Sequence, residues 1–191
     1  MIVLVLLLVV VARGAVAETF TVPSSSMTPT LRPGDRIVAW KPQAQQVSRG
    51  EVVVFNATDA FALGSSSTGV AGWFRQAGHL VGIRVGETDY VKRIVAIGGD
   101  TVVIGDDGIL RVNGSVVRER YLRASPRAGG PPLRVEVPAG AVFVLGDNRA
   151  NSQDSRAHLG SPGGGMVPVN DIIGRVTVRY WPLDSWGTLS E

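Results

Sequence analysis

A serine-rich segment is the first feature of this chain that could do chemistry. Residues 23–31, Pro-Ser-Ser-Ser-Met-Thr-Pro-Thr-Leu, place three consecutive hydroxyls between two prolines. A rigid, exposed loop of this kind suits a nucleophile, although an ordinary serine-rich turn has the same composition. A serine attacks a carbonyl only when another group takes its proton. The two histidines, His79 and His158, lie in no pattern that suits a catalytic triad.

A lysine is the alternative proton acceptor. The chain has only two lysines, Lys41 and Lys92, against seventeen arginines. Lys92 lies in the apolar, strand-like residues 90–97, where the two-residue period of a strand puts it on the face opposite Arg93. Burial there would lower its pKa from about 10.4 and make it a base. The pattern suggests a Ser/Lys hydrolase, with a surface lysine as the alternative for Lys92.

A dense polar loop is the third feature. Residues 146–156 follow the apolar residues 141–145 and carry several acids and arginines. They would form either a buried ion-pair network that supports the catalytic strand or a solvated turn held by Asx hydrogen bonds. The chain has no cysteine, which excludes a thiol nucleophile and thiolate metal sites, and the carboxylates lack a metal-ligand arrangement. We therefore expect neither a metal nor another cofactor.

The elements that must position these residues read as strands. Glycine and proline interrupt short apolar runs, and Asn113-Gly114 is typical of a type I′ hairpin turn. A net charge of +3 with scattered basic residues argues against nucleic-acid binding. We expect a mainly β, antiparallel sandwich or barrel-like domain over residues 18–191. Its strands are expected at residues 19–22, 35–40, 51–56, 90–97, 101–104, 109–112, 116–118, 133–137, 141–145 and 172–181.

The N-terminus is apolar. Residues 2–12 would span about 16 Å as a helix, which is short for a bilayer core of about 30 Å. Three interpretations compete: a leader cleaved after Ala15-Val16-Ala17, a buried core element, and a membrane-anchor helix that is short or lacks its first turns. We expect an anchor over residues 1–17, and self-cleavage after Ala17 stays open.

Four motifs together resemble one family. Residues 23–31, 49–55, 90–100 and 146–149 follow the order found in bacterial type I signal peptidases, the membrane-tethered Ser/Lys proteases that remove signal peptides from exported proteins. The resemblance covers residues 18–182. It implies Ser26 as the nucleophile and Lys92 as the general base. It also implies that Ser24 joins the backbone N–H of Ser26 in the oxyanion hole, and that Ser152 orients the lysine amine.

The resemblance also assigns supporting residues. Four charged residues match ion-pair positions that support the dyad: Arg93, Asp147, Asp154 and Arg156. Five apolar residues match or adjoin the walls of pockets that select small side chains at positions −1 and −3 of the substrate: Phe20, Val22, Met27, Leu31 and Val91. Ala150 replaces an aspartate that is usual after Asp-Asn-Arg, so one loop carboxylate of the family is missing.

The implied setting is the plasma membrane. The resemblance implies a single-pass protein with an extracytoplasmic catalytic domain that contacts lipid, lies near the secretion translocon and acts on the signal peptides of preproteins. The alternatives are a related Ser/Lys maturation protease for pilus or conjugation proteins, a self-cleaving repressor-type protease, a secreted non-catalytic β-domain, and an inactive family member that acts as a binding module. A repressor is disfavoured because no DNA-binding domain precedes the dyad.

Overall fold

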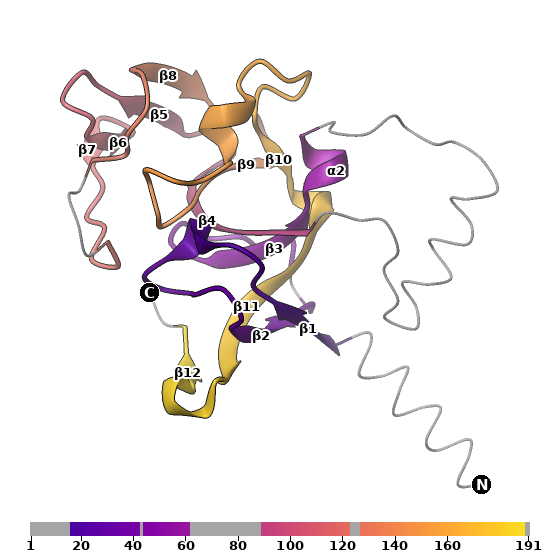
Figure 1. Ribbon diagram of the computed structural model, residues 1–191. Coiled ribbons are helices and arrows are strands. Elements are labelled where there is room, and N and C mark those ends of the chain that lie inside the picture. Colours follow the sequence, from indigo (N-terminus) through magenta and orange to yellow (C-terminus); the bar gives the residue numbers. More distant parts are fainter. Residues whose placement is uncertain (1–15, 43, 62–88, 123–126, 190–191) are drawn as a thin grey trace, which may run out of the picture.

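Two antiparallel sheets build the part of the chain that the structure describes (Figure 1). The computed structural model describes residues 16–42, 44–61, 89–122 and 127–189. The larger sheet has the order β1-β2-β11-β3-β4-β9-β10, with β12 paired to β11. Its strands are β1 (Ala17–Thr21), β2 (Arg36–Trp40), β3 (Val52–Asn56), β4 (Asp89–Ile97), β9 (Ala141–Leu145), β10 (Val167–Pro168), β11 (Ile172–Trp181) and β12 (Gly187–Thr188).

The central strands are apolar on both faces because both faces are covered. All of β9 is buried, as are the first four residues of β3, so these strands read as unbroken apolar runs rather than as alternating ones. The antiparallel register pairs Val53 with Lys92 and Val52 with Arg93, and a bulge follows between Ile94 and Ala96. Lys92 thus belongs to a strand held on both sides by buried neighbours.

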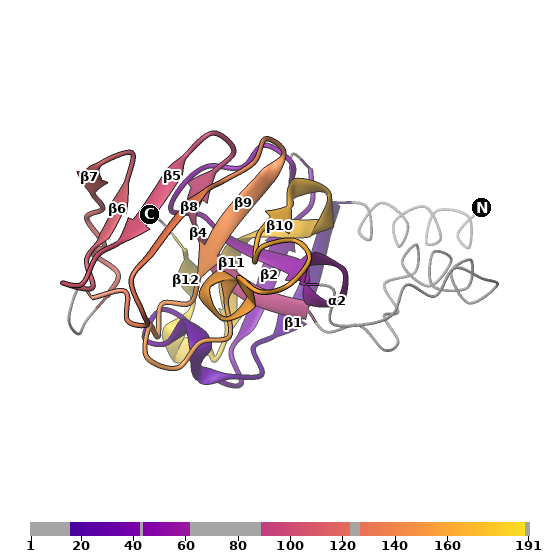
Figure 2. The same ribbon diagram turned by 90° about the horizontal axis from the view of Figure 1, so that it is seen from above.

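The smaller sheet has the order β7-β6-β5-β8. Its strands are β5 (Thr101–Ile104), β6 (Leu110–Val112), β7 (Ser115–Val116) and β8 (Leu133–Glu136). Asn113 and Gly114 join β6 to β7 with φ values of 52° and 77°, as the predicted type I′ turn requires. Figure 2 shows this sheet at the end of the domain opposite β1 and α2 (Ala57–Ala60).

Most of the expected architecture is confirmed. Each of the ten predicted strands exists, with ends that agree within two residues, and the fold is mainly antiparallel β. The two-residue strands β10 and β12 and four 3-10 turns were not predicted: η1 (Ser25–Met27), η2 (Ser155–His158), η3 (Val169–Asp171) and η4 (Leu183–Ser185).

The predicted anchor falls almost wholly on residues 1–15, which lie outside the described residues. Ala17 is the first residue of β1. Within the described part of the chain, every helix is too short or too polar to cross a membrane.

Candidate active site

The serine-rich segment forms a short 3-10 turn that is tied to the core from below. Met27 and Leu31 are fully buried in the apolar cluster beneath the turn, and the Leu31 backbone N–H donates to the Met27 carbonyl at 2.9 Å. This anchoring leaves Ser26 at the surface of the cluster, with 9% of the residue exposed. A hydroxyl on such a turn has a fixed position and still faces a cavity.

The second lysine of the chain lies against this serine. Lys92 Nζ is 2.9 Å from Ser26 Oγ and 3.0 Å from the Val91 carbonyl oxygen, and it lies 4.8 Å from the centre of the Tyr90 ring. Among the described residues, no carboxylate forms a salt bridge with it. Burial lowers the pKa of Lys92 to about 8, while the charges of Asp154 and Asp147 act in the opposite direction.

A second hydroxyl adjoins the pair. Ser24 is exposed, and its Oγ donates to Ser26 Oγ over 3.2 Å. Ser24 lies in extended backbone immediately before the 3-10 turn, so its side chain reaches the same side of the turn as Ser26. The geometry is suited to a hydroxyl that helps an oxyanion form beside the serine.

A cavity of about 300 Å³ opens onto the two groups. Three of the five predicted wall residues, Val22, Met27 and Val91, line it. Phe20 packs half-buried against the apolar cluster beneath the turn, and Leu31 lies inside that cluster; neither lines the cavity. The other lining residues are Pro23, Ser24, Ser25, Ser26, Asp89, Tyr90, Lys92, Asn151 and Gln153.

The polar loop after β9 holds the backbone of Ser26. The Asn148 N–H donates to the Ser26 carbonyl at 2.9 Å, and Asn148 Nδ2 donates to the Ser25 carbonyl at 3.1 Å. A Cβ added at Gly146 would lie 2.5 Å from the Ser26 carbonyl oxygen and 2.2 Å from Ser152 Oγ. Only glycine therefore permits the loop to approach the serine this closely.

The four predicted ion-pair residues form two pairs beneath this loop. Arg93 donates to both carboxylate oxygens of Asp147, at 2.9 and 2.7 Å, and both side chains are buried. Arg156 donates to both oxygens of Asp154, at 2.9 and 2.7 Å. Asp154 also accepts the Gly146 N–H at 3.0 Å. Bidentate pairs of this kind fix geometry as well as neutralise charge.

Ser152 is near the dyad but makes no contact of the predicted kind. Its Oγ is buried and finds no hydrogen-bond partner among the described groups. The second acceptor of the lysine amine is instead the Val91 carbonyl. Orientation of Lys92 by Ser152 therefore stays a prediction.

Two further contacts were missed at the level of sequence. Thr30 Oγ1 donates to Asp147 Oδ2 at 2.5 Å, and Arg149 forms a buried, bidentate pair with Glu119. Arg149 also donates from Nε to the Gly146 carbonyl at 3.0 Å, which links the smaller sheet's connecting segment to the loop beside Ser26. Thr30 belongs to the serine-rich motif, but nothing in the local pattern around Glu119 marks it as a partner.

The described ranges bring together no three histidine, cysteine, aspartate or glutamate side chains that could hold a metal ion. The chemistry that this arrangement offers is nucleophilic: a hydroxyl, a buried amine with a lowered pKa and an apolar cavity beside them.

Comparison with known proteins identifies the family. The family model described as "Signal peptidase, peptidase S26" matches residues 1–181. The chain is 35% identical to a signal peptidase I of Mycobacterium tuberculosis, over 91% of this chain and 68% of the relative. It is 36% identical to a probable signal peptidase I-2 of Synechocystis, over 94% of this chain and 70% of the relative. Among solved structures, a signal peptidase I from Enterococcus faecalis shares 22% identity with a TM-score of 0.45, over 69% of this chain and 97% of that one. On the extent of these matches, the chain belongs to the signal peptidase family, peptidase S26.

Proposed function

We propose that Ser26 and Lys92 carry out the reaction of a signal peptidase in this chain. Membership of the family makes the chain a serine endopeptidase that acts on the signal peptides of preproteins. One observation carries the assignment of the dyad. Lys92 Nζ is buried 2.9 Å from Ser26 Oγ, and no described carboxylate pairs with it to keep it charged.

The reaction balances with these groups alone. Neutral Lys92 takes the Oγ proton as Ser26 attacks the scissile carbonyl, and the new oxyanion receives hydrogen bonds from the Ser24 hydroxyl and the Ser26 N–H. The protonated amine then gives its proton to the leaving amine, which leaves an acyl-enzyme. Lys92 next takes a proton from water, the hydroxide attacks the ester, and Ser26 recovers its proton.

The shape of the cavity supports a preference for small substrate side chains. Val22, Met27 and Val91 present apolar walls, and the enclosed volume of about 300 Å³ is shared by the dyad and the substrate. The cavity lies between the segment before Ser26 and the start of β4, so an extended peptide would run between them. Larger side chains at −1 and −3 would meet these walls, which selects small ones.

The proposed setting is a membrane surface. Residues 1–17 would anchor the protein, with the catalytic domain on the extracytoplasmic side, in contact with lipid and close to the translocon. The apolar sequence of residues 2–12 supports this proposal. A maturation protease for pilus or conjugation proteins would use the same dyad, but no feature of the described residues favours it. A non-catalytic β-domain would gain nothing from a buried lysine without a counterion.

The dyad is tested by paired substitutions in the full chain, purified in detergent and given a peptide with an Ala-x-Ala cleavage site. Ser26→Ala and Lys92→Ala should each lower kcat by at least about a thousandfold. Ser48→Ala and Lys41→Ala are the matched controls, because Ser48 is exposed and does not line the cavity and Lys41 pairs with Glu18 away from it. The controls should retain activity. An active Lys92→Ala variant would show that another group takes the proton.

A further inference from the structure

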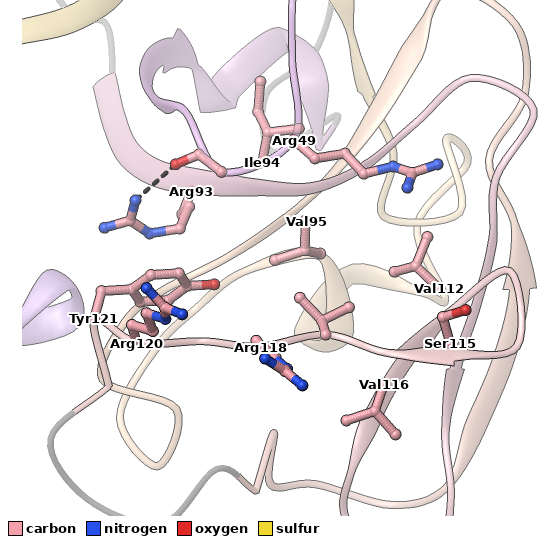
Figure 3. Close-up of a pocket in the computed structure, with 12 residues that line it drawn as sticks. Arg49, Arg93, Ile94, Val95, Val112, Ser115, Val116, Arg118, Arg120 and Tyr121 are labelled. Atoms are coloured by element: carbon pink, nitrogen blue, oxygen red, sulfur yellow. Dashed lines mark hydrogen bonds between the residues drawn. The ribbon is translucent and has the colours of Figure 1, made fainter. Parts of the chain in front are cut away.

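A second, larger cleft lies between β4 and the segment that follows β7. It encloses about 560 Å³ and shares no lining residue with the dyad cavity. Figure 3 shows Arg49 and Ile94 along one side and Arg118 and Tyr121 along the other. The side chain of Val95 lies between the two sides.

The cleft has an unbalanced positive charge. Four arginines and no carboxylate line it: Arg49, Arg93, Arg118 and Arg120. Arg49 is neutralised by Asp100 and Arg93 by Asp147. Arg118 and Arg120 are exposed, and neither forms an ion pair with any residue in the described part of the chain. Two positive charges therefore remain for an occupant, and they favour an anionic one.

Within the part of the chain that the structure describes, the wall that carries these charges is also an open sheet edge. β7 is the end strand of the smaller sheet, and residues 115–118 and 120–121 all line the cleft. Val116 is 57% exposed there, and the register of β6 with β7 places the buried Val112 on the opposite face, beside Ser115. An unpaired edge next to an apolar floor is the arrangement that receives an added extended chain, because the backbone supplies hydrogen bonds and the floor accepts alternate side chains.

We propose that this cleft binds an extended peptide segment with alternating acidic and apolar side chains, supplied by a partner protein. Its carboxylates pair with Arg118 and Arg120, and its apolar side chains, on the other face of the extended chain, contact Val112 and Val117. The open edge favours a peptide over a free fatty acid, which would use the charges and the apolar floor but not the backbone. The site is separate from the proposed catalytic function, since it uses neither Ser26 nor Lys92.

Fluorescence anisotropy with a labelled probe, acetyl-Val-Glu-Val-Asp-Val-Glu-amide, tests the proposal. The protein is the full chain in detergent with Ser26→Ala, so that the probe stays intact. We expect saturable binding that weakens as salt rises from about 50 to about 500 mM. The double variant Arg118→Glu/Arg120→Glu should weaken binding by at least about tenfold. Arg134→Glu, an exposed arginine on β8 that does not line the cleft, should change it less than about twofold.

A charge-reversed probe separates loss of the site from loss of the fold. Acetyl-Val-Lys-Val-Lys-Val-Lys-amide should not bind the parent protein and should bind the Arg118→Glu/Arg120→Glu variant. Three outcomes would overturn the proposal: no saturable binding of the acidic probe, equal loss with Arg134→Glu, or failure of the charge-reversed pair to bind. Binding of octanoate, measured by calorimetry, without binding of the acidic peptide would overturn the proposal and assign the cleft to a small amphiphile instead.

Discussion

Lys92 and Arg93 are consecutive cations that differ in what surrounds them. Both are almost completely buried, with 4% and 3% of each residue exposed, and they point to opposite faces of β4. Arg93 meets both oxygens of Asp147 and the Gly50 carbonyl. Lys92 meets a hydroxyl and a carbonyl oxygen, both uncharged.

This difference in surroundings gives the two residues different roles: Arg93 is a structural cation, whereas Lys92 is an amine that can take part in chemistry. Removing a charge from water costs several kcal/mol, and a buried pair repays this cost only with good geometry and further hydrogen bonds. Arg93 has both. Among the described residues, Lys92 has no such pair to offset its loss of hydration, so burial lowers its pKa to about 8. The strand thus places a fixed charge on one face and a titratable amine on the other.

Removing the structural cation should have the largest effect on stability. Arg93→Met leaves the Asp147 carboxylate buried without its partner, and should lower the free energy of unfolding by about 3 to 5 kcal/mol. Chemical denaturation at pH 7 measures this. The double variant Arg93→Met/Asp147→Asn, which leaves no unpaired charge, should recover most of the loss. If the double variant is no more stable than the single one, the pair does not act through charge.

Removing Lys92 should have the opposite effect on stability, and raise the free energy of unfolding. Lys92 has a pKa of about 8 when folded, against an ordinary lysine value of 10.5, so the unfolded chain binds more protons between these values and stability rises with pH there. Below pH 8 the folded state carries the full cost of the buried charge. Lys92→Met should therefore raise the free energy of unfolding at pH 7, by on the order of 3 kcal/mol, while it abolishes activity.

The pH dependence of that gain is its control. At pH 11 the amine is neutral in both states, so the advantage of Lys92→Met over the parent protein should largely vanish. Lys41→Met, at the partly exposed pair with Glu18, should show no comparable gain at either pH. A destabilised Lys92→Met protein at pH 7 would mean that the lysine is held by an interaction that offsets its burial.

Sequence was informative where a local pattern decides the structure. The period of β4 separates Lys92 from Arg93, and Asn113-Gly114 fixes a hairpin through its positive φ values. The strands that were not predicted, β10 and β12, are two residues long and exist only because a neighbouring strand pairs with them. No local pattern marks such segments, since their hydrogen bonds depend on the finished sheet.

In the candidate site too, the residues that lie in local motifs were predicted, and those that depend on tertiary packing were not. The motifs pointed to Ser26, Lys92 and the two ion pairs of the loop, which lie together in the fold. Glu119 lies 30 residues from Arg149, in a segment without regular structure, and their contact depends on how the two sheets pack. Phe20 and Leu31, which the resemblance placed at or beside the pocket walls, pack in or against the apolar cluster beneath the turn and do not line the cavity.

The hydroxyl beside the nucleophile should have an effect limited to catalysis. Ser24 is exposed and touches Ser26 Oγ, so Ser24→Ala should cost little stability and lower kcat by about a hundredfold, with KM nearly unchanged. Ser24→Thr keeps the hydroxyl and should retain more activity than the alanine variant. Steady-state kinetics with the Ala-x-Ala peptide measure both. An equal loss in the two variants would point to packing rather than to a hydrogen bond.

The pH profile tests whether the two faces of β4 act on each other. Only neutral Lys92 is a base, so kcat/KM should rise about tenfold per pH unit below an apparent pKa of about 8 and level off above it. The charge of Asp147, on the structural face, holds this pKa up against burial. Asp147→Asn, which removes this negative charge and leaves Arg93 in place, should therefore move the rising limb to lower pH, whereas Lys41→Ala should leave it in place. A limb that stays fixed in Asp147→Asn would show that the structural pair positions the strand without tuning the amine. A profile that is flat between pH 7 and 9 would remove Lys92 as the titrating base.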